Sequence, residues 1–427
     1  MVPSSELSRL GEVTSLITKG ATPTTYGYQF VEEAQSQAAF IGAYNCTFEG
    51  NLKLDTKKWI SKEANESLKR SKLQAGDSIL CIVGNTIGSS FLVDESILPA
   101  NINQNVALIR PIKERLSSLY LKHAICSSFI QWQVKMEASI QAQPSLSLKQ
   151  VGDFKIFTPP LPEQRKIAQI LSTWDRGIAT TEKLIDASKQ QKKALMQQLL
   201  TGKKRLVDPE TGKAFEGEWE EVKLEKCLSL MRSGLSRKLE NENIGIAVIR
   251  SNNVGERYTS NEDLKYWYLD DPQGANVQNY ILDDGDILVN FINSLSQIGK
   301  TCIYKKDGSQ NAIYTTNLLR LKPDIEVITG DFLFYLTKTE RYRNAVKSIT
   351  KPAVNQASFT TKEFGKITFT IPNLEEQHKV ASVLTAADNE IELLVAKLAH
   401  FKQEKKALMQ QLLTGKRRVK VAETEAA

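Results

Sequence analysis

Three short stretches of the sequence contain residue types that could support catalysis. The first, SLSQIGKT at residues 294–301, is similar to a phosphate-binding loop, in which backbone amides and a lysine hold a nucleotide. That loop requires glycine where Ser294 stands, with a strand before it and a helix after it. Here the stretch leads into TCIYKK, which has the pattern of another strand. The sequence therefore predicts no nucleotide site at this position.

The other two stretches have the composition of methyltransferase and nuclease motifs without their arrangement. An amino-methyltransferase needs a glycine-rich cofactor loop and an Asp/Asn/Ser-Pro-Pro-aromatic loop that holds a flipped base. The only Pro-Pro pair lies in TPPLPEQ, between Thr158 and Leu161, and AFEGEW has a single glycine. DPETGK, at residues 208–213, has the carboxylates and lysine of a metal-dependent nuclease. It follows a predicted helix, where we expect a polar turn.

Histidine and cysteine form no recognisable site either. The three histidines are too few and too scattered to indicate a triad or a metal centre. The five cysteines include no CxxC pair, which favours reduced, buried thiols over disulfides or zinc. The sequence predicts no catalytic centre and no metal site, so we expect a protein without enzymatic activity of its own.

The composition is that of a globular protein with several domains. The chain has 427 residues, of which 41% are hydrophobic and 25% are charged. No apolar run approaches the ~18 residues that a membrane span requires. The N-terminus lacks the basic-then-apolar order of a signal peptide. We expect a cytoplasmic protein with no membrane contact.

The formal charge of +7 is unevenly distributed. Residues 189–205 carry six cations and no acid, and residues 402–420 carry seven cations and Glu404. These two tails supply +6 each, which leaves −5 for the remainder. The cations of the two tails could contact the phosphates of a nucleic acid. They could equally complement the dipole at the C-terminus of a helix. The sequence leaves both interpretations open.

The main feature of the sequence is an internal repeat. An offset of 213 aligns residues 164–205 with 377–418 without a gap, and about half of the positions are identical. Upstream, LKQVGDFKIFTPPLPEQRK pairs with TKEFGKITFTIPNLEEQHK, and LGEVTSLITKG pairs with LEKCLSLMRSG. The period is about half the chain, so the sequence predicts a duplicated unit of one domain plus one helix.

Within each unit a β-rich part precedes a long helix. SILCIVG, NVALIRPI, DILVNFI and NLLRLKP alternate in polarity between turn residues and predict strands. Short helices are expected in residues 117–136 and 329–346. The prolines at 159–162, or Pro372, favour the start of a helix of roughly 40 residues that ends at Gly202 or Gly415.

Each long helix has a seam of apolar residues at alternating steps of four and three, as in a coiled coil. Two matching seams in one chain most simply pack against each other, and a pseudo-two-fold relation would make them antiparallel. Separate helices, each docked on its own domain, remain an alternative. We predict the following helix-pair contacts: Leu171, Trp174, Ile178, Leu195, Leu384, Ile391, Leu398 and Leu408.

A duplicated domain on a helical frame is suited to holding two recognition surfaces at a fixed distance. The frames are about half identical while the domains have diverged, which indicates one mechanical role and two targets. Two half-sites along a DNA duplex fit this logic, because they require a spacer and separate base contacts.

The repeated segments resemble a known family. FTPPLPEQRKIAQILSTWDRGI with LLTGKKRL, and FTIPNLEEQHKVASVLTAADNEI with LLTGKRRV, are similar to the two helical regions of the specificity subunit of Type I restriction-modification systems. LGEVTSLITKGATP, AGDSIL and DDGDILV resemble turns in the target-recognition domains of that family. The resemblance extends over nearly the whole chain.

The resemblance implies an α/β (α+β) fold: two β-rich target-recognition domains joined by two long antiparallel coiled-coil helices, with an internal pseudo-two-fold repeat. It places target-recognition domain 1 at residues 1–158 and the first long helix at 159–205. A linker and target-recognition domain 2 follow at 206–371, the second long helix at 372–418, and a disordered tail at 419–427.

The same resemblance implies the partners. They are double-stranded DNA with a bipartite asymmetric site, two adenine-methylating modification (M) subunits and two ATP-driven restriction (R) subunits. S-adenosylmethionine, ATP and Mg would then belong to the partner subunits, with no cofactor in this chain. A scaffold that organises protein partners through its helices, without DNA selectivity, is the alternative.

Base edges are read by Asn, Gln, Arg, Lys, Ser and Thr side chains on loops. Polar loop residues are usually solvated turns, so we expect fewer than half of the candidates to touch DNA. Asn105 and Asn317 occupy equivalent positions and could instead cap a turn in both domains. The candidates are Thr22, Asn85, Thr86, Asn103, Asn105, Gln141, Gln143, Arg237, Asn290, Asn293, Ser294, Asn317, Lys351, Asn355 and Gln356.

Overall fold

The computed structural model describes residues 6–33, 36–53, 58–139, 143–208, 210–308, 310–353 and 356–421. The chain forms two compact units, and each unit takes residues from both halves of the sequence. Unit 1 comprises Met1–Lys183 and Ala396–Ala427, and unit 2 comprises Leu184–Val395. The last six residues of the expected C-terminal tail lie outside the described residues.

Unit 1 is built on a four-stranded antiparallel sheet in the order β2-β8-β5-β6. Its strands are β2 (Thr14–Lys19), β8 (Val106–Pro111), β5 (Ser78–Cys81) and β6 (Ser90–Leu92). A second sheet has the order β4-β3-β7, with β4 (Lys58–Ile60), β3 (Ala38–Ile41) and β7 (Ala100–Ile102). β1 (Leu7–Arg9) pairs with β9 (Lys155–Phe157). β5 and β8 are almost wholly buried, so they divide the apolar cores of the unit between their two faces.

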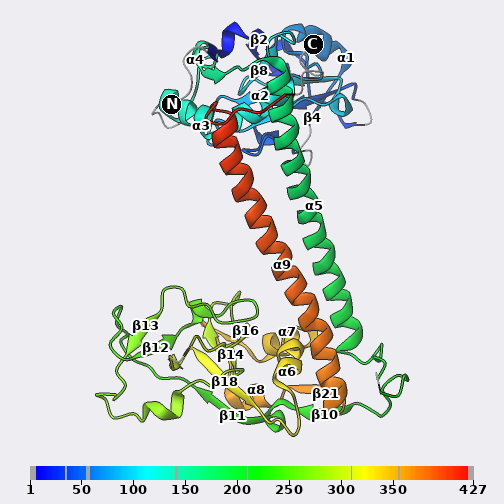
Figure 1. Ribbon diagram of the computed structural model, residues 1–427. Helices are drawn as coiled ribbons and strands as arrows, with labels where there is room; N and C mark the ends of the chain where they lie inside the picture. The colour runs from blue at the N-terminus through cyan, green and yellow to red at the C-terminus, as the bar shows by residue number, and fades with distance from the viewer. Residues whose placement is uncertain are drawn as a thin grey trace. The chain divides into compact units, whose positions relative to one another are not determined.

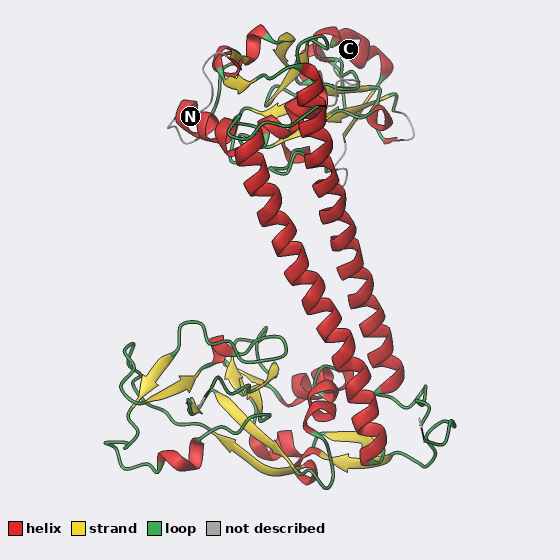
Figure 2. Ribbon diagram, in the orientation of Figure 1, coloured by secondary structure: helices red, strands yellow, loops and turns green. Residues whose placement is uncertain are grey.

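Unit 2 repeats this topology. Its strands are drawn in yellow in Figure 2. The main sheet has the order β11-β18-β14-β16, formed by Leu228–Ser233, Leu318–Pro323, Ile287–Asn290 and Thr301–Ile303. The second sheet has the order β13-β12-β17, formed by Lys265–Trp267, Ile246–Ile249 and Ala312–Tyr314. β10 (Glu220–Lys223) pairs with β21 (Thr368–Ile371). A small third sheet, β15-β20-β19, consists of Ile292–Asn293, Ala357–Ser358 and Lys351–Pro352.

Short helices cover one face of each main sheet. In unit 1 they are α2 (Ser118–Ile125), α3 (Ser128–Glu137) and α4 (Leu148–Asp153), whereas α1 (Lys62–Ser67) packs against the second sheet. In unit 2 they are α6 (Gly330–Leu336), α7 (Glu340–Ile349) and α8 (Thr361–Gly365). The Ser127 hydroxyl accepts a hydrogen bond from the backbone of α3, and Thr339 does the same for α7. These N-caps divide each expected helical stretch into two helices.

One buried ion pair recurs beside the AGD and DGD turns. Gly76 and Gly285 have φ values of 91° and 90°, which favour glycine at these turns. The next residue, Asp77 or Asp286, is almost fully buried. The Arg110 guanidinium donates two hydrogen bonds of 2.7 Å to the Asp77 carboxylate, and Arg320 Nε lies 2.7 Å from Asp286. The turns that the sequence repeats therefore anchor the central strand of each sheet.

The two long helices confirm the expected frame. α5 (Leu161–Leu199) and α9 (Leu374–Leu412) each contain 39 residues. Each is followed by a left-handed glycine, Gly202 with φ 68° and Gly415 with φ 69°. After the glycine, the Lys204 amide donates to the Gln198 carbonyl, and the Arg417 amide donates to that of Gln411. These bonds satisfy carbonyls of the last turn of each helix after the left-handed glycine.

Segments of α5 and α9 lie side by side in each unit (Figure 1). In unit 1 the Trp174 ring meets the Phe401 ring edge-on at 5.5 Å, and Lys405 Nζ lies 2.5 Å from Asp175. In unit 2 Lys192 forms the equivalent ion pair with Asp388. An early segment of one helix meets a late segment of the other in both units, so the helices run antiparallel.

The remaining predicted helix-pair residues take related positions. Leu171 and Leu384 are fully buried in the cores of units 1 and 2. Leu408 packs against the core that contains Leu171, and Leu195 packs against the core that contains Leu384. Ile178, Ile391 and Leu398 are half-buried.

No described helix combines the length and the apolar character needed to cross a bilayer. In the same part of the chain, no three His, Cys, Asp or Glu side chains come together in a way that could hold a metal ion. The five cysteines are free thiols, and burial raises the pKa of Cys227 to about 11 and of Cys302 to about 12.

Candidate nucleic-acid interface

In unit 1, three loops converge at one end of the main sheet. The antiparallel register pairs Lys19 with Ala107 and Cys81 with Val106. The end of β2, the start of β8 and the end of β5 therefore lie together. The loops that continue from them hold most of the predicted base-reading residues of this unit. We call the loops at this end of either main sheet the reading loops of that unit.

Asn85 and Thr86 are exposed on the loop after β5. Val83 forms a β-bridge with Ser145, and the Gly84 amide donates to the Pro144 carbonyl. These contacts bring exposed Gln143 beside Asn85 and Thr86, although the two segments are about 60 residues apart in the sequence. Gln141 lies outside the described residues.

The Thr86 hydroxyl lies 3.4 Å from Cys81 Sγ, and three further candidates of unit 1 form hydrogen bonds within the protein through a side chain or the backbone. The Thr22 hydroxyl donates to the Gln104 side-chain oxygen. The Asn103 side chain accepts a hydrogen bond from the Asn105 amide, so Asn103 closes a turn. The Asn105 carbonyl accepts from the Ile82 amide, whereas its half-buried side chain makes no hydrogen bond to another described residue.

Unit 2 has the same convergence of loops with a different connection. The register pairs Ser233 with Leu319 and Asn290 with Leu318. The small sheet β15-β20-β19 then pairs Asn293 with Ala357, and Lys351 with Ser358. This sheet brings Asn293 and exposed Ser294 close to exposed Lys351 and Gln356. Asn355 lies outside the described residues.

Three further candidates of unit 2 are tied into the structure. Arg237 donates to both carboxylate oxygens of the buried Asp271 side chain, and this contact holds the pKa of Asp271 well below its usual range. Asn290 is only 1% exposed. The Asn317 carbonyl accepts from the amides of Phe291 and Ile292, which parallels the role of Asn105 in unit 1. Direct base contact by Arg237 or Asn290 would require these side chains to leave their present positions.

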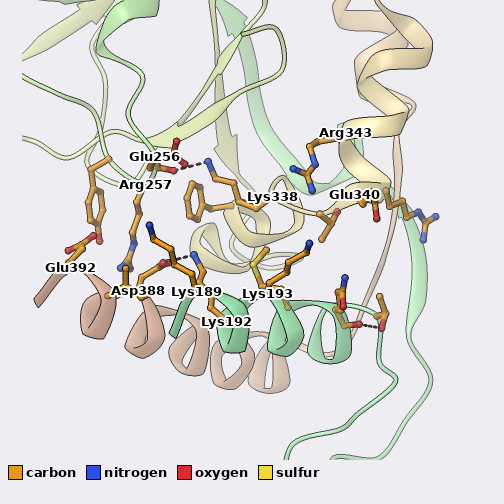
Figure 3. Close-up of a pocket in the computed structure, with 18 of the residues that line it drawn as sticks. Lys189, Lys192, Lys193, Glu256, Arg257, Lys338, Glu340, Arg343, Asp388 and Glu392 are labelled. Carbon is orange, nitrogen blue, oxygen red and sulfur yellow. Dashed lines mark hydrogen bonds and ion pairs between the residues drawn. The ribbon is translucent and has the colours of Figure 1, made fainter. Parts of the chain in front are cut away.

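A basic cavity, which the sequence analysis did not predict, lies within unit 2 (Figure 3). It has a volume of about 1260 Å³ and lies between the end of α5, the start of α7 and α9. Eight cations and four acids line it. The sequence signal was the pattern ERYRNAVK, in which Arg341, Arg343 and Lys347 share a helix with buried Tyr342 and Val346.

Three of the cations have fixed structural partners. Lys192 pairs with Asp388, and Arg257 donates to Asn389 and Thr385. Lys338 Nζ donates to the carbonyls of Glu256 and Thr301, and burial lowers its pKa to about 8. Figure 3 shows Lys193 on α5 and Arg343 on α7 facing each other across the cavity.

Unit 1 contains a Ser-His-Asp group at the junction of α2 and α5. His123 Nε2 lies 3.1 Å from the Ser172 hydroxyl, and Nδ1 lies 3.8 Å from Asp175, which also pairs with Lys405. Unit 2 has Tyr335, Thr385, Asp388 and Lys192 at the equivalent positions, and the Tyr335 hydroxyl donates to Asp388 at 2.8 Å. Because tyrosine replaces the histidine, we interpret the group as a repeated structural contact and not as a catalytic triad.

His123 should make the stability of unit 1 depend on pH. The side chain is 2% exposed, and burial lowers the pKa of His123 to about 4. Between pH 4 and 6.5 the unfolded chain binds a proton that the folded chain does not, so stability falls as the pH drops. From pH 7.5 to pH 5 we expect a loss of about 2 kcal/mol. His123→Tyr copies the residue of unit 2, and the midpoint of its urea unfolding should depend much less on pH. If the pH dependence is unchanged, His123 is not its source.

Comparison with known proteins agrees with the repeated architecture. The sequence profile of the family described as "Type I restriction modification DNA specificity domain" matches residues 5–189 and 216–403. Among curated proteins, the chain is similar to two from Methanocaldococcus jannaschii. One is the putative type I restriction enzyme MjaX specificity subunit, 32% identical over 46% of each chain; the other is the MjaVIII specificity subunit, 28% identical over 84% of this chain and 83% of that one.

Solved structures show the same fold. A chain from a study of assembly and conformational transition of the type I R-M system matches with a TM-score of 0.58 at 18% identity, over 98% of this chain and 100% of that one. The S subunit of a Type-I restriction-modification system from M. genitalium matches with a TM-score of 0.57 at 14% identity, over 95% of each chain.

Proposed function

Because the chain belongs to the Type I restriction-modification DNA specificity family, we propose that it reads a bipartite, asymmetric DNA site with one half-site per unit. The observation that carries the proposal is the convergence of reading loops at the same end of both main sheets. The loops present different side chains, Asn85, Thr86 and Gln143 in unit 1 and Asn293, Ser294 and Gln356 in unit 2. Two unlike half-sites follow from two unlike sets of hydrogen-bonding groups.

The proposed partners follow from the repeated frame. α5 and α9 carry the same contacts twice, which supports two equivalent docking positions for methyltransferase subunits, with restriction subunits joining them. Catalysis, S-adenosylmethionine, ATP and Mg would belong to those subunits, and this chain would act in the cytoplasm without turnover of its own. A scaffold without DNA selectivity is the competing function.

The test is sequencing of methylated adenines in DNA from cells that express the chain with its methyltransferase partner. We expect a split motif with a gap of fixed length. Exchanging the part of unit 1 before α5 for that of a relative should change one half of the motif and leave the other half intact. The corresponding exchange of the part of unit 2 between α5 and α9 should change the other half. A motif that stays the same after both exchanges would exclude the proposal and favour the scaffold.

A further inference from the structure

We propose that five unpaired cations of unit 2 bind the phosphodiester backbone of DNA beside the reading loops. They are Lys189 and Lys193 on α5, Arg343 and Lys347 on α7, and Lys300 before β16; we call them the cationic track. The inference rests on the proposed function and adds to it a positioning surface, separate from the base-reading residues. Phosphate contacts of this kind fix a protein on the duplex without reading its sequence.

Two adjoining cavities connect the five cations. The cavity in Figure 3 is lined by Lys189, Lys193 and Arg343. A second cavity of about 950 Å³ is lined by Lys300, Arg343 and Lys347, together with Leu295 and Pro352. Arg343 lines both cavities. Leu295 follows the predicted base-reading residues Asn293 and Ser294, so the track runs from the end of α5 to the reading loops.

The track cations are free to meet a ligand. All five side chains are exposed, and none forms an ion pair or side-chain hydrogen bond with another described residue. Their neighbours Lys192, Arg257 and Lys338 are occupied by partners within the protein. The first cavity has twice as many cations as acids, and one of its acids, Asp388, is already paired with Lys192. A polyanion therefore complements this surface better than an acidic or apolar ligand of low charge.

The internal repeat helps to identify the polyanion. The position of Arg343 is occupied in unit 1 by Gln131, whose amide donates to the carbonyls of Gly88 and Ile125. The position of Lys300 is occupied by the buried Ser89, and the counterpart of Lys189, Lys402, pairs with Glu182. A protein that docks equivalently on both halves would need features that both halves share. Arg343 and Lys300 are therefore specific to unit 2, whereas unit 1 has exposed lysines, Lys406 and Lys135, at the positions of Lys193 and Lys347. The two positions that differ favour contact with one part of a DNA site.

The experiment uses the full chain assembled with its methyltransferase partner and a duplex of about 40 base pairs that contains the methylated motif. The variant combines Lys193→Gln, Arg343→Gln and Lys347→Gln. Each lost phosphate contact lowers the slope of log K against log salt by about 0.9, so we expect a slope smaller by between about 2 and 3. Binding at 0.15 M salt should be about 100-fold weaker. The recognised motif should be unchanged, because phosphate contacts carry no base information.

Two controls separate charge at the track from charge in general. Lys406→Gln removes an exposed cation at the position of unit 1 that is equivalent to Lys193, and it should leave the slope nearly unchanged. Arg343→Lys keeps the charge and should retain most of the affinity. A triple variant with the wild-type slope would overturn the inference. So would loss of the methyltransferase from the purified complex, which would assign the track to an acidic protein surface.

The outcome for the proposed function is read separately. If the wild-type complex binds all duplexes equally, the proposed function fails, while the salt slopes of the wild type and the variant still decide whether the track contacts phosphate. If the wild type is selective and the slopes agree, the function holds and the track is rejected.

Discussion

Gly20→Ala should weaken binding of the DNA site about 100-fold and abolish its methylation in cells. A Cβ atom at this position would lie 1.8 Å from the Ile102 carbonyl oxygen and 2.7 Å from that of Asn103. Both obstacles are backbone atoms, so the loop after β2 must move away from the end of β7 and the residue that follows it. We expect a cost of about 3 kcal/mol for this overpacking, which equals a factor of about 100 in affinity when the displaced loop is a reading loop.

The repeat supplies the matching variant in unit 2. At Gly234 a Cβ atom would lie 2.0 Å from the Tyr314 carbonyl oxygen. Gly234→Ala should therefore affect the second half-site in the same way. Duplexes with one half-site scrambled can assign each effect, because a damaged unit no longer distinguishes its own half-site from a scrambled one. The other half-site should still be distinguished in each case.

Gly27→Ala is the control in the same loop as Gly20. Gly27 has a φ of 82° and no atom near its would-be Cβ, so alanine causes only backbone strain of about 1 kcal/mol. In cells that express Gly27→Ala, methylation of the DNA site should stay close to the wild-type level. Equal losses for Gly20→Ala and Gly27→Ala would show that the close backbone approach does not matter for recognition.

Glu376→Gln should give the largest loss of stability among the charge variants. The Glu376 carboxylate, 1% exposed, accepts two hydrogen bonds from Arg205, at 2.7 and 2.6 Å. Removing the charge leaves Arg205 without its partner beside Trp219, and breaking such a pair costs about 3 kcal/mol. The measurement is the midpoint of urea unfolding of the full chain at neutral pH.

Glu163→Gln breaks the equivalent pair in unit 1 and should cost less. Glu163 accepts from Arg418, but the Arg418 side chain is 48% exposed, whereas that of Arg205 is 24% exposed. Water can solvate the freed Arg418, so we expect about 1 kcal/mol. In Arg205→Gln/Glu376→Gln the second substitution should recover part of the loss. Equal effects of Glu163→Gln and Glu376→Gln would contradict the dependence on burial.

The sequence was sufficient for features that depend on local pattern. The 213-residue offset, the seam and the positions of Gly202 and Gly415 predicted two long helices, and the alternation predicted β5, β8, β14 and β18. The two matching seams and the pseudo-two-fold relation predicted the antiparallel pairing, and the resemblance supplied the family. Turn glycines and the spacing of the seam depend only on residues that are close together in the sequence, so they can be predicted without tertiary information.

Features that depend on distant pairing could not be predicted in this way. The role of Arg205 required the register that brings it to Glu376, 171 residues away. The small sheet that unites Ser294 with Gln356 uses two-residue strands without a periodic signal. Arg237 and Asn290 looked like exposed loop residues because their burial depends on Asp271 and on the β14 register. Which candidates touch bases stays a prediction.

The end of α9 packs into unit 1, and this has a consequence for synthesis on the ribosome. Leu412 and Leu413 belong to the core of unit 1, and the Arg418 side chain and the Val419 amide both donate to Glu163. Leu412, Leu413, Arg418 and Val419 are all translated after the last residue of unit 2. Unit 1 is thus the first to be synthesised and the last to be completed. A messenger truncated before residue 412 would yield a nascent protein whose first domain keeps an uncovered apolar face, a substrate for chaperones and proteases.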